Sequence, residues 1–378
     1  MVVLEKTNKV LQKVKVSGGG RCNVTHACFE VQELVKRYPR GQSLLKKSLH
    51  HFMPQQTIEW FKQRGVEIKE EPDGRMFPAT DDSQTIIDAI WQEMMKQRVV
   101  MRYGRQVRSV VKDADKFKIV FDDGGDYLAD KVMLACGSIL KPEQYTWLTD
   151  LGHTLQPPVP SLFTFNLPNN DITQMMGVSM PEVTVKVAGT KFIQQGPLLI
   201  THWGFSGPAV LRSSAWAAKW LHEKNYKFTV LINWLKDQNE TDLKAKIQQL
   251  RSQQGSQLVH HKNPFELPKR LWEFLLIRCG VTEQIRWGEL PAAAQNKLIQ
   301  SLVADSYAVK GKTTFKEEFV TCGGVTTSEI NPSTMESRLV PGLYFGGEAM
   351  DVDGITGGYN FQHAWCSGWI AAREMGNG

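Results

Sequence analysis

Apolar and polar positions follow two periods along this chain, one typical of strands and one typical of helices. Short apolar or alternating runs predict strands at 2–5, 106–111, 116–121 and 127–136. Apolar residues at helical spacing predict helices at 81–98 and 359–375, the first capped by Asp81, Asp82 or Ser83. The order of strands and helices indicates an α/β fold.

The middle of the chain differs from both ends. A proline-rich segment at 157–160 marks a boundary. Strand patterns follow it, the sequence becomes polar and helical from residue 240, and a strand is expected again at 315–320. We therefore predict a discontinuous first domain at 1–158 and 319–378, a β-rich insert at 159–235 and a helical insert at 236–318.

Composition excludes several classes of protein. The 378 residues carry a net charge of +6, and 42% of them are apolar. No apolar run approaches the roughly 20 residues of a membrane span, and the first residues do not form a signal peptide. The six cysteines are scattered without CxxC pairs, which argues against a metal site or disulfide framework and favours the cytoplasm.

The first chemical motif is C-terminal. The segment 342–348 has a short apolar strand and ends in Glu348, and 353–360 adds a glycine-rich loop before a helix. Glycines let a flat ligand approach the backbone, and the helix N-terminus can stabilise negative charge on a reduced flavin. Glu348 can accept a hydrogen bond from a ribityl or ribose hydroxyl. The alternative is a loop that only joins strand to helix.

The second motif is Ser17 to Asn23, with three consecutive glycines followed by Arg21 and Cys22. Such a backbone can form an anion-binding nest, and Arg21 can bind a phosphate or a carboxylate. Asn23 can cap the next turn or bond a ring edge. Cys22 is either a reactive thiol or a buried inert one, and the whole segment is alternatively a flexible loop.

With these motifs in place, the chain resembles the BaiN/YhiN-type flavoproteins, a family of NAD(P)/FAD-dependent oxidoreductases. The resemblance covers nearly the whole chain. It is most specific at 17–23, 74–78, 199–208, 322–325 and 342–360. It implies a two-dinucleotide-type FAD domain, Rossmann-like, that is interrupted by an insert with a β-rich and a helical part.

The motifs and the resemblance together assign the site residues. The expected FAD contacts are Glu5, Gly18, Gly19, Gly20, Arg21, Cys22, Asn23, Val107, Ala135, Cys136, Gly137, Gly347, Glu348, Asp353, Gly357, Gly358, Tyr359 and Asn360. Candidates for facing the flavin in catalysis are His202, Arg75 and Tyr359. His202 is alternatively a structural histidine, and Arg75 a surface turn residue. No metal site is expected.

The resemblance implies hydride transfer between flavin N5 and a small organic substrate such as a conjugated enone. NAD(P)H is the candidate electron donor, although the sequence has no second nicotinamide fingerprint. Relatives begin with a strand and a G-x-G-x-x-G turn that this sequence lacks, so we expect Met1 to be internal to a longer chain. Residues 139–150 also differ from many relatives, which leaves the substrate side open.

Two other functions are kept. A flavin-dependent RNA-modifying enzyme would carry a dense Lys/Arg face on the helical insert, including Lys244, Lys246, Arg251, Lys262, Lys269 and Arg270. Acids are interspersed there, so a solvated helix face is the simpler interpretation and nucleic acid is not the expected partner. A scaffold without cofactor is the third function, in case the chain does start at Met1.

Overall fold

The polypeptide leaves one folded unit and later returns to it, so that a second unit is inserted between two of its strands. The computed structural model describes residues 1–261, 263–313 and 320–377. The first unit comprises Met1–Ser161 and Phe315–Gly378, and the second Leu162–Thr314. The strand expected at 315–320 and the boundary expected between 318 and 319 fall almost entirely outside the described residues. The division into three domains stays a prediction.

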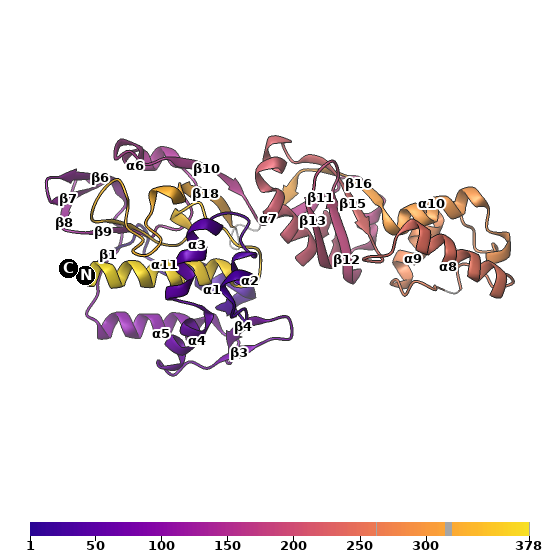
Figure 1. Ribbon diagram of the computed structural model, residues 1–378, viewed down its shortest axis with the longest axis horizontal. Helices are drawn as coiled ribbons and strands as arrows, with labels where there is room; N and C mark the ends of the chain where they lie inside the picture. The colour runs from indigo at the N-terminus through magenta and orange to yellow at the C-terminus, as the bar shows by residue number, and fades with distance from the viewer. Residues whose placement is uncertain (262, 314–319, 378) are drawn as a thin grey trace. The chain divides into compact units, whose positions relative to one another are not determined.

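The first unit is an α/β assembly whose longest helix, α11, is C-terminal (Figure 1). Its helices are α1 (Gln12–Gly20), α2 (Val31–Val35), α3 (Gln42–Ser48), α4 (Pro54–Lys62), α5 (Ser83–Lys96), α6 (Thr146–Asp150) and α11 (Tyr359–Gly376). Short 3₁₀ turns are η1 (Leu49–His51), η2 (Pro142–Tyr145), η5 (Thr327–Glu329) and η6 (Gly347–Ala349). Helix α11 packs against α3, α4 and strand β2 (Thr25–His26).

The strands of the first unit form small sheets. They are β1 (Val2–Leu4), β3 (Ile68–Glu70), β4 (Arg75–Pro78), β5 (Val100–Arg102), β6 (Val107–Asp113), β7 (Lys116–Phe121), β8 (Asp126–Ala129), β9 (Val132–Leu134), β10 (Leu155–Pro160), β18 (Thr321–Val325) and β19 (Leu343–Phe345). Strand β1 pairs in parallel with β5, and β9 in parallel with β19. Parallel pairs joined through helices are typical of Rossmann-like folds.

The segment predicted as strand at 127–136 forms two strands, and the second matches the separate strand also predicted at Val132–Ala135. The segment divides into β8, which continues the antiparallel sheet of β6 and β7, and β9, which pairs with β19 instead. The polar pair Asp130 and Lys131 separates the two. The apolar segment after it is buried more readily in a parallel pair than on an exposed hairpin.

The two connections to the second unit lie next to each other in the first. Strand β10 runs antiparallel to β18, and the Ser161 N–H donates to the Val320 carbonyl at 2.9 Å. The chain therefore departs after β10 and returns before β18 at neighbouring positions.

The second unit has one antiparallel sheet with helices against it. Its strands are β11 (Thr164–Asn166), β12 (Ser179–Val187), β13 (Ile193–Thr201), β14 (Gly204–Ser206), β15 (Lys227–Asn233), β16 (Asp305–Lys310) and β17 (Lys312–Thr313). Among the described residues their order is β16-β15-β12-β13-β14-β11-β17. Strands β16 and β17 follow the helical segment in sequence and still belong to this sheet.

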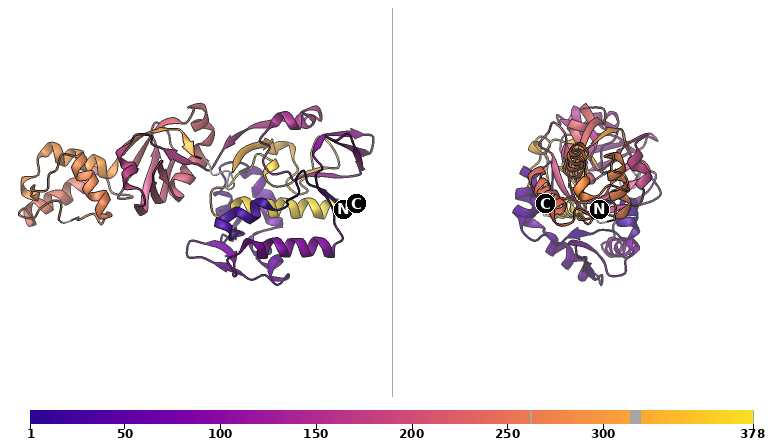
Figure 2. Two further views of the ribbon diagram at one scale, coloured as in Figure 1. Left: turned by 180° about the vertical axis from the view of Figure 1, so that it is seen from behind. Right: turned by 90° about the vertical axis from the view of Figure 1, so that its right-hand side faces the viewer.

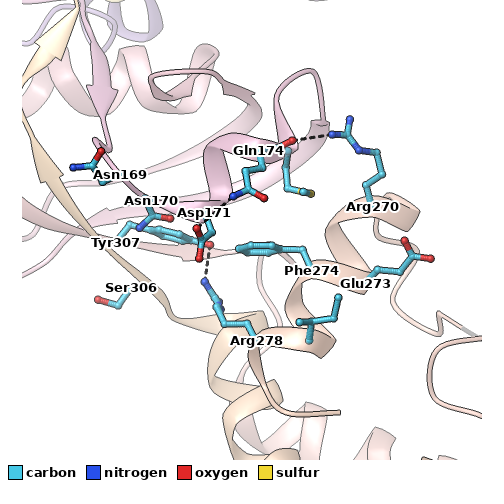
Figure 3. Close-up of a pocket in the computed structure, with 12 residues that line it drawn as sticks. Asn169, Asn170, Asp171, Gln174, Arg270, Glu273, Phe274, Arg278, Ser306 and Tyr307 are labelled. Carbon is cyan, nitrogen blue, oxygen red and sulfur yellow. Dashed lines mark hydrogen bonds between the residues drawn. The ribbon is translucent and has the colours of Figure 1, made fainter. Parts of the chain in front are cut away.

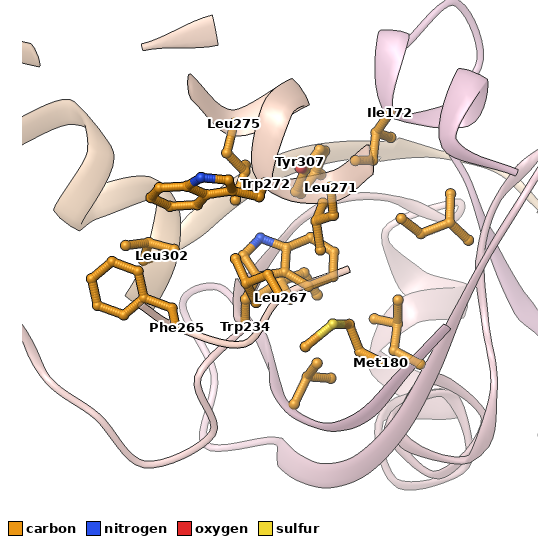
Figure 4. Packing of buried hydrophobic residues seen from close by; sticks show 14 of the residues in the cluster. Ile172, Met180, Trp234, Phe265, Leu267, Leu271, Trp272, Leu275, Leu302 and Tyr307 are labelled. Atoms are coloured by element: carbon orange, nitrogen blue, oxygen red, sulfur yellow. The ribbon is translucent and has the colours of Figure 1, made fainter. Parts of the chain in front are cut away.

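Helices of the second unit are α7 (Pro208–Glu223), α8 (Glu240–Gln253), α9 (Lys269–Arg278) and α10 (Ala292–Val303), with 3₁₀ turns η3 (Asp171–Met175) and η4 (Trp287–Glu289). Figure 2 shows α8, α9 and α10 grouped at one end of this unit. One buried cluster joins the helices to the sheet, with Trp234 beside Leu271 and Trp272 of α9 (Figure 4). Within the described residues, no helix has the length and apolar character to cross a membrane.

Candidate cofactor site

The N-terminal glycine motif forms a left-handed loop at the end of α1. Gly18, Gly19 and Gly20 have φ values of +59°, +70° and +85°, and Cys22 has +61°. A non-glycine residue would be strained at such angles. A methyl group added at Gly19 or Gly20 would meet no atom within 4 Å. Open space therefore lies over the backbone of these two glycines, as a flat ligand requires.

The C-terminal glycine motif has a packing role that the sequence pattern did not indicate. A Cβ added at Gly358, where φ is +88°, would lie 2.5 Å from the carbonyl oxygen of Thr25. A Cβ added at Gly357 would lie 2.8 Å from the Tyr359 ring. These glycines let the start of α11 pack on β2, and they leave less room for a ligand at their own Cα atoms.

The two glycine motifs meet although they come from opposite ends of the sequence. The Asn23 amide, oriented with its oxygen toward the Gly358 N–H at 2.9 Å, directs its nitrogen to the Thr25 carbonyl. Trp365 of α11 donates its indole N–H to the Val24 carbonyl at 2.9 Å. The predicted convergence of both motifs on one place is thus present in the geometry.

Aromatic rings pack against each other beneath this junction. His26 stacks on Tyr359 with 4.7 Å between ring centroids, and its Nδ1 lies 3.0 Å from the Gly357 carbonyl oxygen. Burial lowers the pKa of His26. Tyr359 is only 4% exposed, and its backbone carbonyl accepts from the Tyr38 hydroxyl. Its ring therefore supports the loop, and a catalytic role for Tyr359 stays a prediction.

Both arginines near the N-terminal motif already have carboxylate partners. Arg21 binds Glu71 at 2.6 Å and lies over the Phe77 ring at 4.0 Å. Arg75 binds Glu71 at 3.0 Å and Asp73 at 2.7 Å. A phosphate bound by either arginine would therefore compete with Glu71.

A second polar cluster lies past the ends of β9 and β19. The Glu348 carboxylate accepts hydrogen bonds from the ammonium of Lys13 and, at 3.2 Å, from the hydroxyl of Ser138. A Cβ added at Gly137 would lie 3.9 Å from Glu348 and 4.0 Å from the Lys13 Nζ. Gly137 and Glu348, both predicted FAD contacts, are thus neighbours. Sequence reasoning missed Lys13 and did not assign Ser138, because no local pattern marks either.

Residue Gly347 is held on both sides by helix α11. Its N–H donates to the Ser367 hydroxyl at 2.9 Å, and its carbonyl oxygen lies 3.1 Å from the Nε2 of His363. Burial lowers the pKa of His363 to about 4. A neutral His363 therefore fixes the backbone that carries Glu348. No local sequence pattern marks these two positioning residues, His363 and Ser367.

Two further predicted contacts have structural partners. Asp353 is fully buried, and its carboxylate accepts from the guanidinium of Arg40 and the hydroxyl of Ser161. The Asn360 amide bonds both the N–H and the carbonyl of Gly354, at 2.8 and 2.9 Å. Their side chains hold the loop before α11, so any cofactor contact they make would come from the surrounding backbone.

The remaining predicted residues lie in different places. Glu5 follows β1, and its carboxylate accepts from the N–H and hydroxyl of Thr7, both at 2.8 Å. Val107 begins β6, close to Arg105, whose N–H donates to the Glu5 carbonyl. Ala135 and Cys136 follow β9, and the Cys136 side chain is exposed. His202 belongs to the second unit, where its ring lies 4.3 Å from that of Trp203.

Helices α1 and α11 link the two polar regions. Helix α1 carries Lys13 near its start and ends in the glycine loop, while α11 begins at the glycine junction and holds Gly347 through its later turns. This arrangement fits an extended dinucleotide, with open backbone at one region and a carboxylate at the other. Within the described residues, no group of His, Cys, Asp or Glu side chains is arranged to hold a metal.

Comparison with known proteins decides the family. The sequence profile of the HI0933-like protein Rossmann domain matches residues 1–374. The chain belongs to the HI0933-like Rossmann-domain family. This match confirms the resemblance to BaiN/YhiN-type flavoproteins and the predicted α/β, Rossmann-like fold.

Similar proteins are named for two different activities. A ribosomal RNA dihydrouridine synthase of Escherichia coli is 32% identical over 99% of this chain and 92% of its own. A second ribosomal RNA dihydrouridine synthase, from Haemophilus influenzae, is 27% identical over 99% of this chain and 92% of its own length. A 3-dehydro-bile acid delta(4,6)-reductase of Clostridium scindens is 27% identical over 98% of this chain and 91% of its own length.

Proposed function

We propose that this protein is an FAD-dependent oxidoreductase that reduces a carbon–carbon double bond conjugated to a carbonyl group, with uridine in ribosomal RNA as its substrate. The carrying observation is 32% identity over 99% of the chain to a ribosomal RNA dihydrouridine synthase. The meeting of the two glycine motifs and the Glu348 cluster support the cofactor part of the proposal.

The two names among the relatives share one chemistry. The C5=C6 bond of uracil is conjugated to the C4 carbonyl, as the double bonds of a steroid enone are to theirs. When bound and reduced, FAD would supply the hydride for such a bond, and a proton would complete the reduction. A reduced nicotinamide, NADH or NADPH, is the proposed donor that is oxidised overall.

The residues of this chain would bind and orient the cofactor. The exposed backbone at Gly19 and Gly20 allows close approach of a flat or anionic group. Glu348 is the proposed acceptor for a ribityl or ribose hydroxyl, since only 12% of its side chain is exposed and Lys13 and Ser138 fix its orientation. Gly347 is kept in place by Ser367 and His363.

A direct test supplies the FAD-loaded protein with NADPH or NADH and unmodified ribosomal RNA transcribed in vitro. Nucleoside mass spectrometry should detect dihydrouridine at a defined position, and none without the nicotinamide. Reduction of a steroid enone together with no dihydrouridine would establish the second candidate function, which the bile acid reductase supports. Failure with both substrates would refute the proposed chemistry.

A further inference from the structure

Positive charge is unevenly divided between the two units. The second unit, Leu162–Thr314, contains 18 Lys and Arg against 11 Asp and Glu, whereas the first unit contains 27 against 28. The net charge of +6 for the whole chain therefore originates in the second unit. An excess of this size attracts polyanions such as RNA, independent of their sequence.

The second unit also has a pocket of about 770 Å³, in the size range of sites for small organic groups. Turn η3, helix α9 and strand β16 line it (Figure 3). Two aromatic side chains line it, Phe274 and Tyr307. Phe274 reaches from α9 toward Asp171 and Tyr307, and the Arg278 guanidinium lies 5.4 Å from the centroid of its ring. Phe274 is half-buried and packs against the core of the unit.

The two arginines that line this pocket already bind neighbouring protein groups. Arg278 is paired with Asp305 and donates to the Tyr307 hydroxyl at 3.1 Å. Arg270 donates to the carbonyls of Gln174 and Met176 at 2.9 and 3.3 Å. Asp171 and Glu273 add negative charge to the lining. The pocket is consequently unsuited to a phosphate, in spite of the basic unit around it.

Uncharged hydrogen-bonding groups remain available. Asn169 is exposed at the rim in a left-handed conformation, with φ +58°. No side-chain hydrogen bond of Asn169 or Ser306 occurs among the residues that the structure describes. An amide, a hydroxyl and an aromatic ring around one space are what an unpaired nucleobase needs for edge recognition and stacking.

We propose that this pocket binds one unpaired nucleobase of the RNA substrate, stacked on Phe274 and bonded at its edge by Asn169, while the excess positive charge of the second unit attracts the backbone. The inference rests on the proposed function for its choice of ligand. It assigns substrate docking to the inserted unit and leaves the chemistry to the first.

Two matched pairs of variants test the pocket in the full-length, FAD-loaded protein. Phe274→Ala removes the stacking ring, and Phe192→Ala removes an equally half-buried ring that packs on the same core outside the pocket. Asn169→Gly removes the amide at a positive φ, and Asn225→Gly does so at φ +49° elsewhere in the unit. Phe274→Tyr restores a ring.

Binding of a single-stranded ribosomal RNA fragment is measured by fluorescence anisotropy at several salt concentrations. Phe274→Ala should raise Kd about tenfold, and Asn169→Gly should raise it severalfold, while both controls and Phe274→Tyr stay near wild type. The slope of log Kd against log salt should not change, because no phosphate contact is lost. Kd values equal to those of the controls would overturn the inference.

RNA binding and dihydrouridine formation are measured separately to distinguish the two proposals. FAD content and reduction of the bound flavin by NADPH are checked in every variant. Wild-type RNA binding that depends on Phe274, without dihydrouridine formation, would support the docking site and refute the proposed reaction. Dihydrouridine formation that is unaffected by both pocket variants would support the reaction and overturn the docking site. Absence of any salt-sensitive RNA binding by the wild type would also overturn it.

Discussion

The side-chain amide of Asn23 and the backbone N–H of Gly358 lie 2.9 Å apart and join the two ends of the sequence at one junction. Each belongs to a glycine motif, and the two motifs come from opposite ends of the sequence. Because Gly358 also lies against the Thr25 carbonyl, a side chain at this position would separate the motifs.

Substitution Gly358→Ala should therefore reduce both stability and FAD content. The positive φ alone costs about 1–2 kcal/mol, and the clash with Thr25 adds about 1–3 kcal/mol. Gly65→Ala is the control, since Gly65 has φ +76° and no neighbour within 4 Å of an added Cβ. Urea unfolding and the flavin absorbance of the purified proteins are measured. An equal loss in both variants would mean that the junction tolerates the side chain.

Substitution Glu348→Gln should weaken FAD binding about tenfold, because a neutral amide replaces a charged acceptor at the same place. Its Lys13 and Ser138 partners keep the side chain near its present position. FAD titration of the apoprotein gives the Kd. Glu374→Gln, which removes a carboxylate paired with Arg373 at the surface, should leave Kd unchanged. A Kd for Glu348→Gln within twofold of wild type would exclude Glu348 from the cofactor site.

Acid should destabilise the protein through His363. The unfolded chain binds a proton on this imidazole below about pH 6.5, whereas the folded protein does so only below about pH 4. The stabilisation is therefore complete at neutral pH and is lost as pH falls through this window. By pH 5 it has decreased by about 2 kcal/mol.

The variant His363→Gln removes this titration. Between pH 7 and pH 5 its free energy of unfolding should fall about 2 kcal/mol less than that of the wild type. Denaturant unfolding at both pH values provides the measurement. Replacement of the exposed His50 by Gln should leave the wild-type difference intact. An unchanged pH dependence in His363→Gln would show that His363 is not the group responsible.

Removing the Asp353 carboxylate should be costly. Asp353→Ala removes the buried carboxylate that accepts from the Arg40 guanidinium, which is 13% exposed, and should cost about 3–5 kcal/mol. The double variant with Arg40→Ala should cost less than the sum of the single changes. Lys69→Ala, in the exposed pair with Asp81, should cost about 1 kcal/mol or less. Additive effects of Arg40→Ala and Asp353→Ala would contradict the coupling.

Local patterns predicted the local elements well. The predicted helix 81–98 is α5, Ser83–Lys96, with the Asp82 carboxylate accepting from the Gln84 N–H. Helix α11 also begins at the predicted Tyr359. Periodicity and capping are properties of neighbouring residues, so they are visible in one sequence.

Long-range partners were beyond such patterns. Nothing near Lys13 indicates that it binds Glu348, and nothing near His363 indicates that it holds Gly347. The interpretation of Gly358 was incomplete for the same reason, since the close neighbour that demands glycine is Thr25. These contacts depend on how distant segments pack, and only the fold reveals them.

The hydrogen bond between Ser161 and Val320 has a consequence for how this protein could evolve. Because the exit and the return of the chain are neighbours on one ladder, an intervening segment of almost any length can be accommodated there without disturbing β10 or β18. The first unit could thus stay the same while the inserted segment changes. Each inserted segment would then select a different class of molecule for the same cofactor site.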